Sequence, residues 1–126
     1  MSASERAVEL AELSARAAHA VKAENVLALD VSAFLPFADV FVIASGSSER
    51  QVGAIAERVE EELSKVGIDA ARREGVRQAR WVLLDFNDVI VHVMHQEDRA
   101  YYDLERLWKD CPVVPLPEDA RADGVA

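Results

Sequence analysis

The 126 residues suffice for one domain, since domains most often hold about 100 to 150 residues around one hydrophobic core. Hydrophobic side chains make up 51% of the chain, which allows it to fold alone. The net charge of −9, from 23 acidic and 14 basic residues, argues against a protein that grips nucleic acid by itself, because such proteins present a surplus of Lys and Arg to phosphates.

The acidity favours a basic partner, because complementary charge accelerates encounter, although an acidic surface can also serve solubility alone. Cys111 is the single cysteine, so no intrachain disulfide can form, and a reducing compartment is favoured. Charged residues interrupt residues 1–20, and no apolar run approaches the ~20 residues that a bilayer requires. The sequence therefore predicts a cytoplasmic protein without a signal peptide or membrane segment.

The N-terminal third predicts one helix followed by two strands. Hydrophobic residues at helical spacing predict a helix that begins with a capping box of Ser2 and Glu5 and ends near Glu24. Two short runs rich in β-branched and aromatic residues predict strands over 25–32 and 39–45.

The middle of the chain predicts an amphipathic helix. Hydrophobic residues in 52–66 recur at i, i+3, i+4 and i+7, while acidic residues fill the remaining face. Ser48 and Gln51 suit a capping box at its start, and Gly67 stands where a left-handed C-terminal cap is expected.

The C-terminal half predicts a β-hairpin. Residues 68–71 are a candidate short strand, and 72–80 form an Arg-rich polar connection. Strands over 81–85 and 89–95 flank a tight turn at 86–88, which favours antiparallel pairing.

A last helix is expected after residues 96–98, closed by Pro112. Its predicted inward-facing residues are Tyr101, Leu104, Leu107 and Trp108. We expect one domain over residues 1–110 and a Pro-containing, frayed tail over 111–126. The resulting order α-β-β-α-β-β-β-α predicts an α/β fold with a mixed five-stranded sheet flanked by helices.

The turn at 45–47 resembles the Gly- and Ser-containing turn with which nucleotidyltransferases hold a triphosphate at a helix N-terminus. The same residues also suit a turn at Gly46 and a helix cap, so both interpretations are open. Nucleotidyl transfer also needs paired carboxylates on one strand face to hold metal. Asp85 is followed at i+2 by Asn87, and Asp88 has the wrong parity, so we expect no metal site.

His92 and His95 are three residues apart on a strand, so their side chains point to opposite faces and cannot chelate one metal ion together. His92 shares the parity of Ile90 and Met94, which favours a partly buried imidazole with one ring nitrogen hydrogen-bonded over a catalytic base. Cys111 suits a small apolar filler. No nucleophile matches either histidine, so we expect no catalytic residue and no cofactor.

Trp81 opens a strand directly after an Arg-rich connection. Trp and Arg are favoured anchors at interfaces, but a Trp at this position could equally pack under a helix. Strand alternation places Trp81, Leu83 and Asp85 on one face and Val82 and Leu84 on the other. A sheet with helices on one side would leave the first face free for a partner.

Taken together, several segments form a recognisable pattern. They are Asp39, residues 45–51, Glu74 with Gly75, residues 81–85, residues 88–94, and Arg99 with Tyr102, Leu104, Glu105, Leu107 and Trp108. This pattern resembles the ribosomal silencing factor family, also called Iojap, from about Leu10 to Trp108. Asn87 departs from the glycine that is usual in the family's hairpin turn, although Asn tolerates positive φ.

The resemblance implies a nucleotidyltransferase-like fold that lacks the catalytic carboxylates. It implies binding to the large ribosomal subunit through ribosomal protein L-fourteen, a block on docking of the small subunit, and lower translation when nutrients run short. It also implies homodimers when free. The residues it places at or near the contact are Trp81, Leu83, Asp85, Arg80 and Glu74, with His92 and Tyr102 matching the motif and serving either the contact or the fold.

Two other functions are open at this point. One is a divergent nucleotidyltransferase that uses the Gly46 turn, and the other is a dimeric scaffold for another basic protein. We expect no direct sequence-specific contact with nucleic acid.

Overall fold

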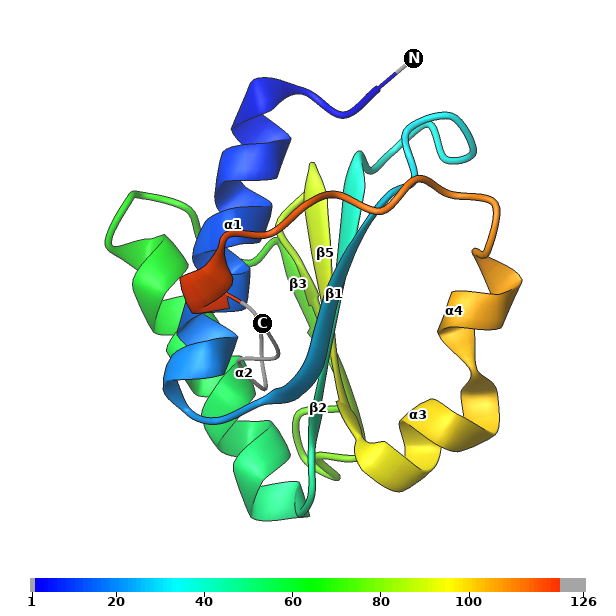
Figure 1. Ribbon diagram of the computed structural model, residues 1–126. Helices are drawn as coiled ribbons and strands as arrows, with labels where there is room; N and C mark the ends of the chain where they lie inside the picture. The colour runs from blue at the N-terminus through cyan, green and yellow to red at the C-terminus, as the bar shows by residue number, and fades with distance from the viewer. Residues whose placement is uncertain (1, 121–126) are drawn as a thin grey trace.

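Five strands form one mixed sheet with helices on both faces (Figure 1). The computed structural model describes residues 2–120. Its elements are α1 (Glu5–Ala20), β1 (Glu24–Asp30), β2 (Val40–Gly46), α2 (Glu49–Ser64), β3 (Arg72–Glu74), β4 (Trp81–Asp85), β5 (Val89–His95), α3 (Gln96–Tyr102), α4 (Leu104–Leu107) and the 3-10 helix η1 (Glu118–Ala120). The predicted α/β class and element order are confirmed, with the last predicted helix divided into α3 and α4.

The strand order across the sheet is β1-β2-β5-β4-β3. Among the strand pairs of the described residues, only β2 and β5 are parallel, because the chain leaves β2 through α2, crosses to the far edge at β3 and returns through β4 to β5. The predicted antiparallel hairpin of β4 and β5 is confirmed, and Asn87 in its turn has φ of 74°. The third strand lies at Arg72–Glu74 rather than at 68–71, so part of the expected polar connection is edge strand.

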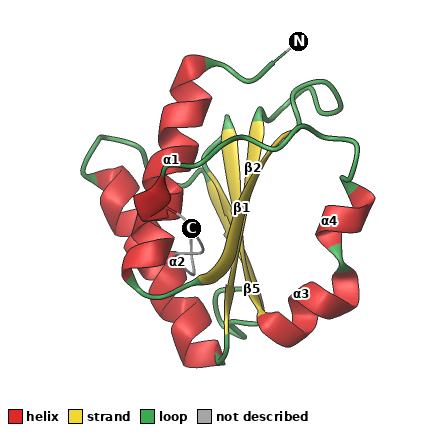
Figure 2. Cartoon of the chain, viewed as in Figure 1, coloured by secondary structure: helices red, strands yellow, loops and turns green. Residues whose placement is uncertain are grey.

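The larger hydrophobic core lies between the sheet and the helices α1 and α2, which pack against each other (Figure 2). Ser48 caps α2 as predicted, since its Oγ accepts a hydrogen bond from the Gln51 amide at 3.1 Å. Helix α1 is capped by Ser4 rather than Ser2, because the Ser4 Oγ accepts from the Ala7 amide, and it ends at Ala20. Gly67 follows α2 with φ of 80°, as expected for a left-handed cap.

A smaller core lies on the opposite face, under α3 and α4. Asp103 adopts a left-handed conformation with φ of 49°, which ends α3 and redirects the chain into α4. Leu104 is buried and Trp108 packs on this core, but Tyr101 is 81% exposed and Leu107 is 71% exposed. The prediction that all four residues face inward from one helix is therefore wrong for Tyr101 and Leu107.

The segment after α4 runs along the outer edge of β1. The Asp30 amide donates to the Pro112 carbonyl, and the Val114 amide donates to the Ala28 carbonyl, each at 2.8 Å. Ala120 is fully buried next to α1. The prediction of a frayed tail from residue 111 is thus wrong for residues 111–120, because this segment pairs with β1 and packs on the domain. Residues 121–126 of the expected tail lie outside the described part.

Across residues 2–120 the structure contains no helix with the length and apolar character that crossing a membrane requires.

Candidate partner-binding face

Strand β4 has one buried side and one half-buried side. Val82 and Leu84 are fully buried in the larger core, whereas Trp81, Leu83 and Asp85 keep part of their surface exposed. This confirms the alternation that the sequence predicts. Trp81 and Leu83 also pack on the smaller core, so their outer surfaces are available to a partner while their inner surfaces stabilise the fold.

The half-buried side exists because helices α3 and α4 cover only part of this face of the sheet (Figure 1). Leu83 lies opposite His92 of β5 on one side and opposite Glu74 of β3 on the other. Glu74, Gly75, Trp81 and Leu83 line a shallow, mainly apolar hollow of about 350 Å³. The expected neighbours Glu74, Trp81 and Leu83 are therefore brought together.

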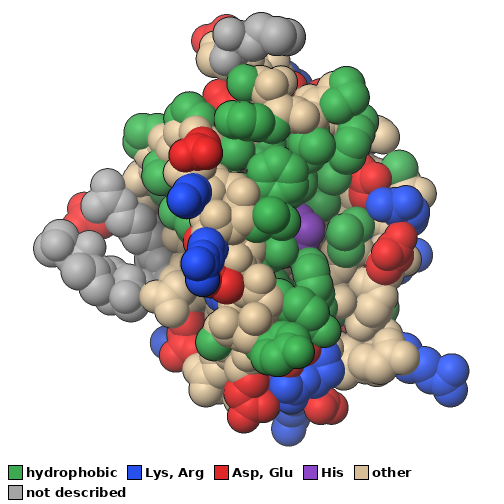
Figure 3. Space-filling model, turned by 90° about the vertical axis from the view of Figure 1, so that its right-hand side faces the viewer, with side chains coloured by type: hydrophobic (Ala, Val, Ile, Leu, Met, Phe, Trp, Pro, Cys, Tyr) green, Lys and Arg blue, Asp and Glu red, His purple; other side chains and the backbone are tan. Residues whose placement is uncertain are grey.

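Tyr102, at the end of α3, extends this surface. Its ring lies 4.9 Å from the Trp81 ring between centroids, and it contacts the exposed Tyr101 ring at 5.0 Å. We call the surface formed by Glu74, Gly75, Trp81, Leu83 and Tyr102 the Trp81 face. Figure 3 views this side of the molecule and shows hydrophobic side chains gathered in a band across it.

Beside the Trp81 face lies an open groove that the sequence patterns did not reveal. Tyr101, Tyr102 and Leu107 line it together with Asp103 and Arg106. Exposed apolar side chains in contiguous groups often mark interaction surfaces. The signal that could have found them is Asp103, which permits the left-handed turn that exposes both Tyr101 and Leu107.

His92 lies beneath the Trp81 face rather than in it, and is only 5% exposed. The Trp81 indole Nε1–H donates a hydrogen bond to His92 Nδ1 at 3.1 Å. One ring nitrogen is thus satisfied, as the sequence predicts. Nε2 has no hydrogen-bond partner among the described residues. Burial lowers the pKa of His92 from 6.5 to about 4, so the imidazole is neutral at physiological pH.

This depressed pKa predicts an acid-sensitive fold. In the unfolded chain, His92 takes up a proton near pH 6.5, whereas in the folded protein it stays neutral until about pH 4. The contribution of neutral His92 to folding stability is therefore complete above about pH 6.5 and is lost as the pH falls towards 4. We expect His92 alone to lower the free energy of unfolding by about 2.5 kcal/mol between about pH 7.5 and about pH 4.5. Urea unfolding of wild type and His92→Leu at both pH values checks this. A difference between the two proteins that does not change with pH would contradict it.

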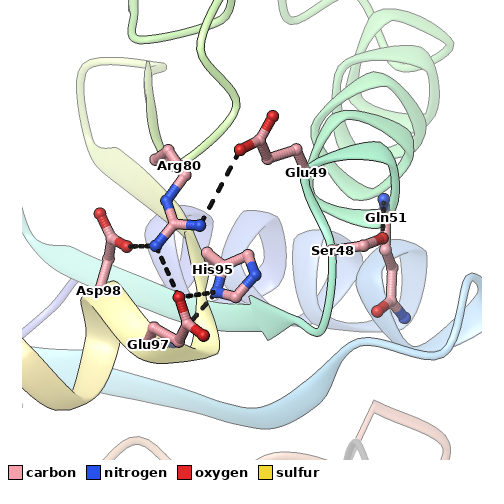
Figure 4. A network of polar contacts seen from close by, with 7 residues as sticks. All are labelled: Ser48, Glu49, Gln51, Arg80, His95, Glu97 and Asp98. Carbon is pink, nitrogen blue, oxygen red and sulfur yellow. Dashed lines mark hydrogen bonds and ion pairs between the residues drawn. The ribbon is translucent and has the colours of Figure 1, made fainter.

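Arg80 does not point into the Trp81 face. Figure 4 shows its guanidinium between carboxylates from two helices. Its Nη2 contacts Glu97 at 3.1 Å and also Asp98, while its Nη1 lies 3.9 Å from Glu49 of α2. The Arg80 carbonyl accepts a hydrogen bond from the His95 amide at 2.8 Å. Arg80 therefore ties α3 to the start of β4.

Asp85 lies at the far end of β4, beside the hairpin turn. Its Oδ1 accepts a hydrogen bond from the Asn87 amide at 2.8 Å, and Arg72 lies 4.0 Å from its Oδ2. These contacts assign Asp85 a role in closing the turn, in addition to the partner contact expected from the sequence.

Arg99 connects elements that are distant in sequence, a role that its place in the family pattern did not indicate. It is 8% exposed, and its Nε contacts Glu105 Oε2 at 3.1 Å. Its Nη1 donates to Ser45 Oγ at 2.8 Å and to the Asn25 carbonyl. Arg99 thereby holds α3 and α4 against the ends of β1 and β2.

Comparison with known proteins places the chain in a family. The sequence profile described as "Ribosomal silencing factor during starvation" matches residues 4–125. Ribosomal silencing factor RsfS of Halalkalibacterium halodurans is 48% identical over 108 residues, which cover 86% of this chain and 92% of the relative. The chain belongs to the ribosomal silencing factor family. RsfS of Bacillus subtilis is 43% identical to this family member, over 83% of this chain and 89% of the relative.

A crystal structure of a protein from Chromobacterium violaceum is similar to this silencing-factor chain over most of its length. It superimposes with a TM-score of 0.78 at 38% sequence identity, covering 80% of this chain and 84% of that chain. The fold is thus shared, over most of the chain, with a protein of known structure.

In this silencing-factor chain, neighbouring residues pack closely on the Gly46 turn and form its hydrogen bonds. A Cβ at Gly46 would lie 3.1 Å from the Val52 amide nitrogen, so glycine allows α2 to approach β2 closely. The Ser47 amide donates to Gln51 Oε1 at 2.8 Å, and Ser48 caps the helix. Within residues 2–120, no group of three His, Cys, Asp or Glu side chains gathers in the manner of a metal site. The local hydrogen bonds favour the structural interpretation of this turn.

Proposed function

We propose that this chain is a ribosomal silencing factor that represses translation when nutrients run short. It binds the large ribosomal subunit through ribosomal protein L-fourteen and blocks association with the small subunit. The observation that carries the proposal is the Trp81 face, where a half-buried tryptophan stands beside an apolar hollow on an uncovered part of the sheet. The names of two similar relatives, both ribosomal silencing factors, support the silencing role.

The mechanism is steric and needs no bond to be made or broken. A tryptophan whose indole is already restricted by contacts inside the fold can fill a pocket on the partner with little further loss of side-chain entropy, which is typical of binding hot spots. The net charge of −9 suits a protein partner in basic surroundings and opposes contact with the ribosomal RNA. Binding therefore stays confined to one protein site, weakens with rising salt, and has no nucleic-acid sequence preference.

The proposal also includes the location, the oligomeric state and the absence of chemistry. The free protein acts in the cytoplasm, where ribosomal subunits join, and it forms homodimers. It uses no cofactor and catalyses no reaction.

Sedimentation through a sucrose gradient tests the proposed function. Purified large and small subunits are mixed under joining conditions with and without excess protein. We expect the joined-ribosome peak to fall and the protein to travel with the large subunit. Undiminished joining at saturating protein would refute the proposal.

The nucleotidyltransferase alternative is tested separately, by calorimetry with nucleoside triphosphates and magnesium. We expect no saturable heat, because Gln51 and Ser48 occupy the turn around Gly46. Saturable binding of a nucleoside triphosphate would favour the enzyme class instead.

A further inference from the structure

The Trp81 indole is held from two directions at once. Its Nε1–H donates to His92 Nδ1 at 3.1 Å, and its ring meets the Tyr102 ring at 4.9 Å with an angle of 48° between the planes. The hydrogen bond fixes one edge of the indole, and the tilted contact with the Tyr102 ring further restricts its rotation. Trp81 is therefore oriented before any partner arrives.

The acceptor under the indole is itself immobilised. His92 is 5% exposed, and its ring makes an edge contact with Phe41 at 4.8 Å. Phe41 in turn makes an edge contact with Trp108 at 5.4 Å. A row of aromatic side chains thus runs from α4 through the smaller core to His92, and it leaves the imidazole little freedom to turn.

The hydrogen bond also determines the tautomer of His92. Because Nδ1 accepts the indole proton, the neutral ring must carry its own proton on Nε2. That Nε2–H is buried and has no hydrogen-bond partner among the described residues. A buried polar atom without a partner destabilises the fold, so a hydrophobic residue of similar size would suit the core better. The hydrogen bond to Trp81 is what a hydrophobic residue could not supply.

We propose that His92 is a positioning residue of the partner-binding surface, whose buried Nδ1 orients the Trp81 indole for the large ribosomal subunit. This inference rests on the proposed function. It adds a residue that does not touch the partner and acts only through Trp81. The burial that keeps His92 uncharged also keeps Nδ1 free to accept the hydrogen bond at neutral pH.

Three variants separate positioning from packing. His92→Leu keeps a side chain of similar volume but removes the acceptor, and His92→Asn places an amide oxygen near the position of Nδ1. Met94→Leu is the matched control, because Met94 lies on the same face of β5, directly opposite Trp81 in the register, and has no role in the hydrogen bond. Each variant is measured for urea stability, for the indole N–H signals in nitrogen-15 NMR, and for affinity to purified large subunits.

For His92→Leu we expect unchanged or higher stability, an indole signal of Trp81 that moves and exchanges faster with solvent, and binding weakened by about five- to tenfold. His92→Asn should be less stable than His92→Leu yet bind more tightly, since its oxygen can accept the indole proton. Met94→Leu should match wild type in NMR and binding.

The outcomes distinguish this inference from the proposed function. If wild type binds the large subunit and His92→Leu binds equally well, His92 has no positioning role although the proposed function stands. Equal weakening by His92→Leu and His92→Asn, or an unmoved Trp81 indole signal in His92→Leu, would also overturn the inference. If wild type itself does not bind, the proposed function fails and the inference fails with it.

Discussion

Replacing Arg99 with alanine should lower the free energy of unfolding by about 2 to 4 kcal/mol, because several hydrogen bonds to its buried charge are lost at once. Burial lowers the pKa of Arg99, and the neighbouring Glu105 offsets this effect. In the variant, Glu105 keeps a half-buried negative charge without its cation, and the Ser45 hydroxyl and the Asn25 carbonyl lose their donor. Urea unfolding at neutral pH measures the change.

Arg106→Ala is the matched control for Arg99→Ala. Arg106 lies on α4 and is exposed, and the structure gives it no ion pair among the described residues. We expect this variant to change the stability by less than about 0.5 kcal/mol, as is usual for surface substitutions. A loss in Arg99→Ala no larger than the loss in Arg106→Ala would show that Arg99 does not hold α3 and α4 on the sheet.

Gly75→Ala should have the second large effect, concentrated on the Trp81 face. A Cβ at Gly75 would lie 2.0 Å from the carbonyl oxygen of Trp81, a backbone atom that cannot turn away, and Gly75 has φ of 75°. The left-handed conformation and the clash together should cost about 3 kcal/mol. The chain between β3 and β4 must shift, so we expect binding of the large subunit to be lost while the larger core stays folded.

Two other glycines separate the clash from the backbone effect. Gly67 has φ of 80°, but a Cβ added there would meet no atom within 4 Å, so Gly67→Ala should cost about 1 kcal/mol and leave binding unchanged. Gly53 lies within α2 with open space around it, so Gly53→Ala should stabilise the protein by about 0.5 to 1 kcal/mol. Unfolding curves and large-subunit binding are measured for all three. If Gly75→Ala binds as well as Gly67→Ala, the loop at Gly75 does not shape the Trp81 face.

Local patterns were sufficient to predict most of the sheet. The alternation of residues along β4 predicts that Val82 and Leu84 share one face of the sheet, and both are fully buried. The cap at Ser48 and the positive φ of Gly67 and Asn87 also follow from residue type at one position. These features depend on neighbours within four residues, so the sequence alone carries the information.

The features that the sequence did not predict depend on contacts between distant residues. Nothing near Pro112 or Val114 indicates that this segment pairs with β1, since its partners lie more than 80 positions earlier. The helix predicted through Asp103 follows helical spacing correctly, but the left-handed turn overrides it. The hydrogen bond from Trp81 to His92 also joins residues that sequence patterns do not connect; it anchors the indole in the smaller core, while part of the side chain stays exposed.

Binding of the large ribosomal subunit by the Trp81 face is tested by comparing the affinity of wild type and Trp81→Ala for purified large subunits. Val66→Ala is the control, because Val66 is 51% exposed near the end of α2, outside the Trp81 face. Urea unfolding must first show that all three proteins are folded at the assay temperature, since Trp81 also packs on the smaller core. We expect Trp81→Ala to lose at least about 2 kcal/mol of binding free energy, or about 30-fold in affinity, while Val66→Ala binds like wild type. Equal affinity of folded Trp81→Ala and wild type would contradict it.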